Sequence, residues 1–120
     1  MSTQKIQAWR HAADICLRDA QYECLSMSGR TDAAFDSCYL YARCVVGEKS
    51  ELYTHPDASI FVLAATELGW FHCVLRPARQ HVYKRDKPPR DGSQFDVLMA
   101  LAVRLERAIG VNDITGERNS

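Results

Sequence analysis

The feature that most constrains the fold of this chain is the spacing of its apolar residues. In four segments they recur at every third or fourth position, the repeat that gathers side chains on one face of an α-helix. Only four prolines and six glycines occur in 120 residues, so little interrupts these segments. With 47 % hydrophobic and 25 % charged residues, the chain has the balance of a globular domain that can bury a core. We therefore predict an all-α fold.

Two predicted helices occupy the first part of the chain. The first runs from about Thr3 to Leu25 and stops in a turn at residues 26–29, where glycine permits a helix end. The second begins at Thr31 or Asp32, because a short side-chain oxygen can accept from the free amides of the first turn. Their apolar faces are Ile6, Trp9, Ala13, Cys16 and Ala20, followed by Phe35, Cys38, Tyr39, Ala42, Val45 and Val46.

Two further helices are predicted in the second part. One begins near Pro56, a residue suited to a first turn, and ends at Gly69. The last begins with a capping-box pattern at Ser93 and ends at Gly110. Residues 70–75 are apolar but too short to assign, so a buried strand-like piece and a bent helix remain alternatives. The apolar faces are Ile60, Leu63, Ala64 and Leu68, then Phe95, Leu98, Ala102, Leu105 and Ile109.

Short connections between helices favour antiparallel packing of neighbours. We therefore predict a single antiparallel four-helix bundle within residues 1–110. Residues 70–92 are expected to form an irregular, basic crossover before the last helix. Residues 111–120 are expected to form a polar, frayed C-terminal tail.

Five cysteines occur, an odd number without a CxxC pair: Cys16, Cys24, Cys38, Cys44 and Cys73. Each lies among apolar residues, so we expect buried, reduced thiols in a cytoplasmic protein. No signal peptide opens the sequence, and no apolar run approaches the roughly 20 residues that span a bilayer. His72 and Cys73 are adjacent, so their side chains diverge, and no zinc-site spacing occurs. Neither a metal nor a cofactor is expected.

Positive charge is concentrated in one segment, residues 76–90. It holds six Lys and Arg against one acidic residue, a net charge of +5. The whole chain has zero net charge, so the remainder carries −5. Such a balance argues against a protein held on nucleic acid by its overall charge, but it allows a local binding surface. The basic residues are Arg76, Arg79, Lys84, Arg85, Lys87 and Arg90.

The same segment contains an R-x4-H-x-Y spacing, formed by Arg76, His81 and Tyr83. It resembles the signature of HEPN-domain proteins, the small helical nucleases and toxins of prokaryotic conflict systems. Its place before the last helix, the chain length and the helical content agree with that family. The resemblance implies a homodimer in which both subunits form a metal-independent ribonuclease site. It therefore suggests an RNA-processing or toxin-type protein.

The resemblance also implies roles for these residues. Arg76 would bind the scissile phosphate, His81 would move a proton at the ribose 2′-hydroxyl, and Tyr83 would line the site. The family usually has a polar residue directly after the arginine, where this chain has Pro77. Proline disfavours a helical conformation of the residue before it, here Arg76. The residues expected to contact the RNA backbone are Arg79, Lys84, Arg85 and Lys87.

Three other interpretations of these residues remain open. The first is a plain solvated loop whose His81 and Tyr83 pack on the rim of the bundle. The second is a segment that binds nucleic acid without cleaving it, since phosphate contacts need only Lys and Arg. The third is a non-enzymatic adaptor or regulator that binds a protein partner through surplus aromatic residues. The aromatic candidates are Tyr39, Tyr41, Tyr53, Phe61, Trp70 and Phe71.

Overall fold

The computed structural model describes residues 3–84 and 93–119 of the chain, with side chains for 4–83 and 94–110. Every regular element in these ranges is helical, which confirms the all-α prediction. The elements are α1 (Thr3–Ala20), α2 (Met27–Val46), the 3₁₀ helix η1 (Gly47–Leu52), α3 (Ser59–Leu68), the 3₁₀ helix η2 (His72–Leu75), α4 (Arg76–Lys84) and α5 (Ser93–Asn119).

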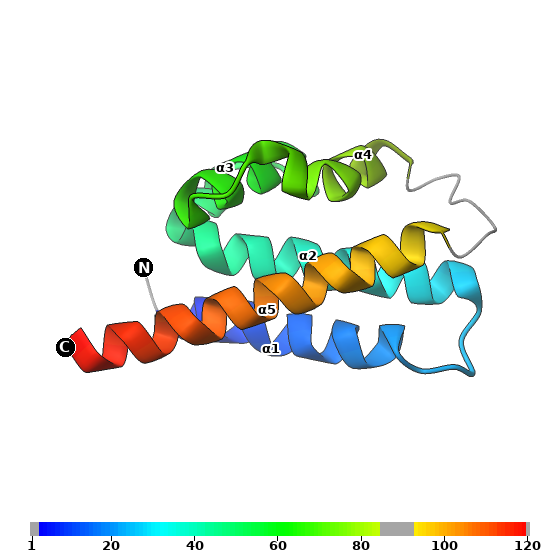
Figure 1. The fold of residues 1–120 in the computed structure, drawn as a ribbon, viewed down its shortest axis with the longest axis horizontal. Helices are drawn as coiled ribbons and strands as arrows, with labels where there is room; N and C mark the ends of the chain where they lie inside the picture. The colour runs from blue at the N-terminus through cyan, green and yellow to red at the C-terminus, as the bar shows by residue number, and fades with distance from the viewer. Residues whose placement is uncertain (1–2, 85–92, 120) are drawn as a thin grey trace.

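Helix α2 is the centre of this arrangement, because it contacts α1, α3, α4 and α5. The long helices α1, α2 and α5 run along the length of the molecule, and α3, η2 and α4 form a further layer over α2 (Figure 1). The described residues thus contain five α-helices where four were predicted. The additional one is α4, which occupies part of the expected irregular crossover.

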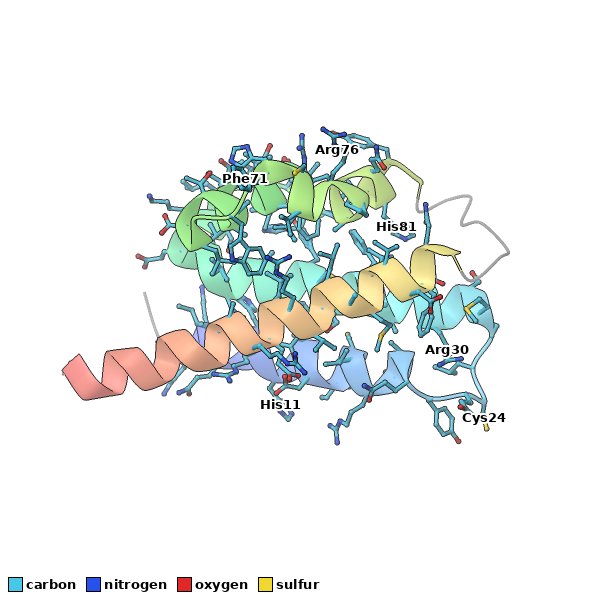
Figure 2. The ribbon with its side chains drawn as sticks, in the orientation of Figure 1. His11, Cys24, Arg30, Phe71, Arg76 and His81 are labelled. Atoms are coloured by element: carbon cyan, nitrogen blue, oxygen red, sulfur yellow. The ribbon has the colours of Figure 1, made fainter. Side chains whose placement is uncertain are left out.

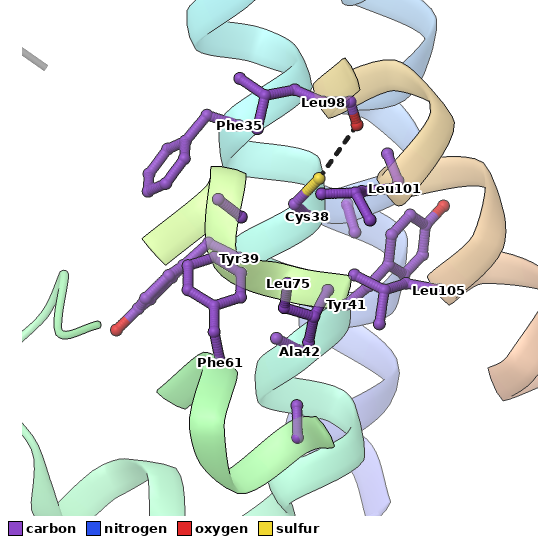
Figure 3. Packing of buried hydrophobic residues seen from close by; sticks show 14 of the residues in the cluster. Phe35, Cys38, Tyr39, Tyr41, Ala42, Phe61, Leu75, Leu98, Leu101 and Leu105 are labelled. Carbon is purple, nitrogen blue, oxygen red and sulfur yellow. Dashed lines mark hydrogen bonds between the residues drawn. The ribbon is translucent and has the colours of Figure 1, made fainter. Parts of the chain in front are cut away.

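The core lies where the apolar faces of these helices meet on α2. Phe35 and Tyr39 from α2 pack with Phe61 from α3, at ring-centroid distances of 5.5–6.0 Å. Beside these rings on α2, the thiol of Cys38 donates to the carbonyl oxygen of Leu98 on α5 at 3.1 Å (Figure 3). Burial of a side chain as large as that of Phe35 or Phe61 contributes about 1.5–3 kcal/mol to the free energy of folding. Four residues of the predicted α5 face are buried as expected: Leu98, Ala102, Leu105 and Ile109.

The turn between α1 and α2 differs from the prediction. Ser26 caps α2, because its hydroxyl accepts from the backbone N–H of Gly29 at 3.0 Å. Helix α2 therefore begins four residues before Thr31, whose hydroxyl instead donates to the carbonyl of Met27 within the helix. Helix α1 ends at Ala20, where the carbonyl oxygen accepts from Nε of Arg30 at 2.8 Å. An arginine from the next helix thus satisfies a carbonyl at the end of α1, which is shorter than predicted.

The region between α3 and α5 is more regular than predicted. Residues 72–75 form a 3₁₀ helix, and α4 continues directly from it. Arg76 is helical (φ −55°, ψ −44°), so the expectation that Pro77 would prevent this is wrong. Pro77 lies in the first turn, where an amide donor has no intrahelical acceptor and its absence costs nothing. Helix α5 continues through Gly110 to Asn119, beyond its predicted end.

The thiols are free, but they are not all buried. Cys38 is buried, Cys16 and Cys44 are half-buried, and Cys24 and Cys73 are exposed. Cys24 is exposed because α1 ends before it, and Cys73 lies in the short η2 helix. Burial raises the pKa of the Cys44 thiol to about 11 and raises that of Cys38 further. No helix within the described residues is both apolar enough and long enough to cross a membrane.

Candidate functional site: the two faces of α4

Helix α4 carries the residues of the R-x4-H-x-Y spacing, and it divides them between two faces. Leu75, Ala78 and His81 recur at three-residue steps, and all three are fully buried. Arg76 and Tyr83 lie on the exposed side. Figure 2 shows Arg76 on the outside of the upper layer and His81 between α4 and α5. The residues are neighbours in sequence, but they have different environments.

The imidazole of His81 joins three helices. Its Nδ1 lies 3.0 Å from Oε1 of Gln94 on α5, a distance at which the N–H donates to the amide oxygen. The ring packs against Phe35 of α2 at a centroid distance of 4.9 Å. Its Nε2 lies 3.8 Å from Oδ1 of Asp32, and both of these buried atoms lack a hydrogen-bond partner among the described residues. His81 thus fills a position in the core and holds α4 to α2 and α5.

A general acid or base must lie within hydrogen-bond reach of the proton that it transfers. His81 has no exposed surface, so a substrate at the surface does not reach its nitrogens in this conformation. Arg76 and His81 are five positions apart in the sequence, which corresponds to about 140° around a helix of 3.6 residues per turn. Within one chain the structure therefore does not bring Arg76 and His81 together.

The structure does bring Arg76, Arg79 and Tyr83 together, and we call these three residues the outer face of α4. They lie at positions i, i+3 and i+7, which share one side of a helix. Tyr83 is 81 % exposed, and Arg76 is exposed as well. Neither arginine has a hydrogen bond or ion pair with any other described residue, and Nε of Arg79 is buried without an acceptor.

Three other basic residues were predicted to bind nucleic acid. Lys84 is the last residue of α4, and its side chain lies outside the part that the structure describes. Arg85 and Lys87 lie outside the described residues altogether. Of the six basic residues in the segment, the structure therefore describes the side chains of two, Arg76 and Arg79, and both lie on the outer face of α4.

A groove between α4 and α5 lies beside this face. Its volume is about 180 Å³, below the roughly 300–1,000 Å³ of pockets that hold small molecules and cofactors. Apolar and amide side chains line it: Pro77, Gln80, Gln94, Val97 and Leu98. Among the described residues, no three His, Cys, Asp or Glu side chains are grouped closely enough to hold a metal ion. The groove has the size for one side chain of a larger partner.

The aromatic residues proposed as a docking patch are mostly inside the fold. Tyr39, Tyr41 and Phe61 are buried, and Tyr53 and Trp70 are half-buried. Phe71 differs, because it is 83 % exposed in the turn before η2 (Figure 2). Most of these residues therefore form the core, as aromatic residues at helical spacing commonly do.

Asp32 and Gln94, the two polar neighbours of His81, were not predicted as part of any site. Asp32 was assigned to a helix cap, and Gln94 had no assigned role. One signal was available in the sequence: His81 follows Leu75 and Ala78 at three-residue steps, the spacing of an inner helix face. That spacing indicates a core position for the histidine once the segment is known to be helical.

No protein-family model, curated protein or solved structure matches this chain.

Proposed function

We propose that this chain is a non-enzymatic helical protein that binds a protein partner through the outer face of α4. The observation that carries the proposal is the division of α4 into two faces. Its two arginines and Tyr83 lie on the outer side without partners among the described residues. His81, in contrast, is buried and hydrogen-bonded to Gln94. Exposed tyrosine and arginine are the residue types that dominate binding energy at protein interfaces.

The competing proposal is the HEPN-like ribonuclease that the R-x4-H-x-Y spacing suggests. That activity would need Arg76 and His81 to face one cleft at a two-fold interface. For His81 to reach such a cleft, α4 would have to rotate or separate from α2 and α5. The imidazole would then lose its contacts with Phe35 and Gln94. A binding function needs no such rearrangement, so the arrangement of α4 favours it.

Incubation with mixed RNA in the presence of a metal chelator separates the two proposals. We expect the wild-type chain, Arg76→Ala and His81→Ala to leave the RNA intact, as a buffer control does. Metal-independent cleavage by the wild type that both substitutions abolish would overturn the non-enzymatic proposal. Sizing chromatography adds a second readout, because the composite ribonuclease site requires a dimer.

Site-specific photocrosslinking in the protein's own cells tests the binding surface. A photoreactive amino acid replaces Tyr83 in one variant and Ala100, an exposed residue of α5, in the matched control. We expect protein adducts from position 83 that are absent from position 100 and that decrease when Arg76→Ala is added. Equal adducts from both positions, or none from position 83, would contradict the assignment of this face.

A further inference from the structure

We propose that the segment of the partner that docks on the outer face of α4 is acidic, a short stretch rich in Asp and Glu. This inference rests on the proposed function and names the chemistry that the surface recognises. Arg76 and Arg79 lie one turn apart and have no ion pair with any described residue. A guanidinium binds a carboxylate through two parallel N–H···O bonds, which makes two adjacent arginines a carboxylate-binding pair.

Arg79 presents only part of its guanidinium to a partner. Its Nε is buried and has no acceptor among the described residues, so a carboxylate at the surface does not reach it. The terminal nitrogens of the same guanidinium are not among the buried unpaired atoms, and together with Arg76 they are the donors that a partner's carboxylate can meet.

The dimensions of the face limit the length of what it binds. Arg76 and Tyr83 are seven residues apart on α4, which corresponds to about 10 Å along the helix axis. An extended peptide covers that distance with about three or four residues. Beside the face, the groove lined by Pro77, Gln80 and Leu98 has room for one apolar side chain. The surface therefore fits a short acidic segment that carries a single apolar residue.

The charge distribution favours a short acidic segment over RNA. Residues 76–90 carry +5, and the rest of the chain carries −5. With zero net charge, the chain lacks the overall positive charge by which proteins hold a long nucleic-acid backbone. An acidic segment of a few residues needs only the local contacts of Arg76 and Arg79.

Fluorescence anisotropy with the full chain tests this inference directly. The probes are a labelled 12-residue peptide of Asp and Glu around one Leu, the same peptide with Asn and Gln, and a labelled 12-nucleotide single-stranded RNA. We expect the acidic peptide to bind about tenfold or more tightly than its amide counterpart. Its binding should weaken as salt rises, because exposed charges are screened.

Variants assign this binding to individual residues. Arg76→Gln should weaken binding of the acidic peptide by about tenfold, and Arg79→Lys should weaken it by less because it keeps the charge but loses the planar guanidinium that binds a carboxylate through two bonds. Arg18→Gln, at an exposed position of α1, is the matched control and should leave binding unchanged. Circular dichroism confirms that each variant is folded.

Two results would overturn the inference: equal binding of the acidic and amide peptides, or RNA binding that exceeds peptide binding and is lost in Arg76→Gln. If the crosslinks from position 83 persist while the acidic peptide shows no preference, the acidic partner is wrong and the proposed function stands. If those crosslinks are absent as well, both proposals fail.

Discussion

Two histidines lie against aromatic rings on adjacent turns of α2, and their environments are opposite. His81 packs on Phe35 at a centroid distance of 4.9 Å, and His55 packs on Tyr39 at 5.6 Å. His81 is fully buried, whereas His55 is exposed. The comparison shows that an aromatic contact does not by itself define what a histidine does. Burial of the remaining ring surface decides whether the histidine is part of the core or lies at the surface.

The hydrogen bonds of the two rings differ in the same way. His81 donates to Gln94 from a site enclosed by three helices. His55 accepts from the Tyr39 hydroxyl at 2.5 Å, and that hydroxyl oxygen in turn accepts from the backbone N–H of Asp57 at 2.8 Å. The hydrogen bond of His81 holds α4 in place, and the hydrogen bonds of Tyr39 with His55 and Asp57 hold the loop before α3. Substitutions at the two contacts should therefore differ in the size of their effect on stability.

The largest effect is expected from His81→Ala. Removal of the imidazole leaves a cavity beside Phe35 and takes the donor away from Gln94. The free energy of unfolding should fall by about 3 kcal/mol, measured by urea denaturation. Arg76→Ala on the same helix is the control and should change it by less than about 0.5 kcal/mol. A loss below about 1 kcal/mol in His81→Ala would show that the buried face of α4 contributes little to stability.

A smaller effect is expected from Tyr39→Phe. The ring remains in the aromatic cluster, but the acceptor for the N–H of Asp57 and the donor to His55 are lost. We expect a loss of about 1–2 kcal/mol in the same urea measurement. Tyr53→Phe, at a half-buried position, serves as the control and should be nearly neutral. Equal losses in the two variants would contradict a specific role for the Tyr39 hydroxyl.

The contact of His55 should also be detectable as a pH dependence of stability. Burial lowers the pKa of His55 from its ordinary value of 6.5, and the nearby cation of Arg43 lowers it further. As the pH falls through about 6.5, the unfolded chain therefore binds the proton before the native chain does, and stability is lost. Above that pH both states are neutral and the effect is absent.

The effect of His55 should be small, because the ring is largely exposed and screened by solvent. Urea midpoints measured between about pH 8 and pH 5 should decrease less in His55→Ala than in the wild type. An identical pH dependence in the two proteins would rule out the contribution of His55.

The smallest effect on stability is expected from Tyr83→Ala. The side chain is 81 % exposed, so its truncation should change the free energy of unfolding by less than about 0.5 kcal/mol. The same variant should nevertheless lose affinity for the acidic peptide in the anisotropy assay. A substantial loss of stability would show that Tyr83 packs on the fold and is not available to a partner.

Segments with a regular apolar repeat predicted their structure well. The segment whose repeat is interrupted by proline and histidine did not. The apolar face of α5 was predicted correctly, and Gly69 ends α3 in a left-handed conformation (φ +70°) that glycine favours. Helix α4 was not predicted, because Pro77 indicated a break and His81 replaces an apolar residue on its buried face. Proline at the start of a helix and histidine in a core both interrupt the apolar pattern from which a helix is predicted.

The same omission determined how the candidate site was interpreted. In a loop of unknown shape, Arg76 and His81 can meet at any angle, so their spacing alone suggests joint chemistry. In a helix, the five-residue separation directs the two side chains to different sides. The grouping of Arg76, Arg79 and Tyr83 on one face follows from the helix. It could be predicted only once this segment was known to be helical.

The contact between His81 and Gln94 has a consequence for the evolution of the chain. This hydrogen bond holds the end of α4 against the start of α5 across a separation of 13 residues. Because the two side chains are partners in one bond, a change at either position alters the same contact, and its effect depends on the residue at the other. Positions 81 and 94 should therefore change together as the sequence diverges.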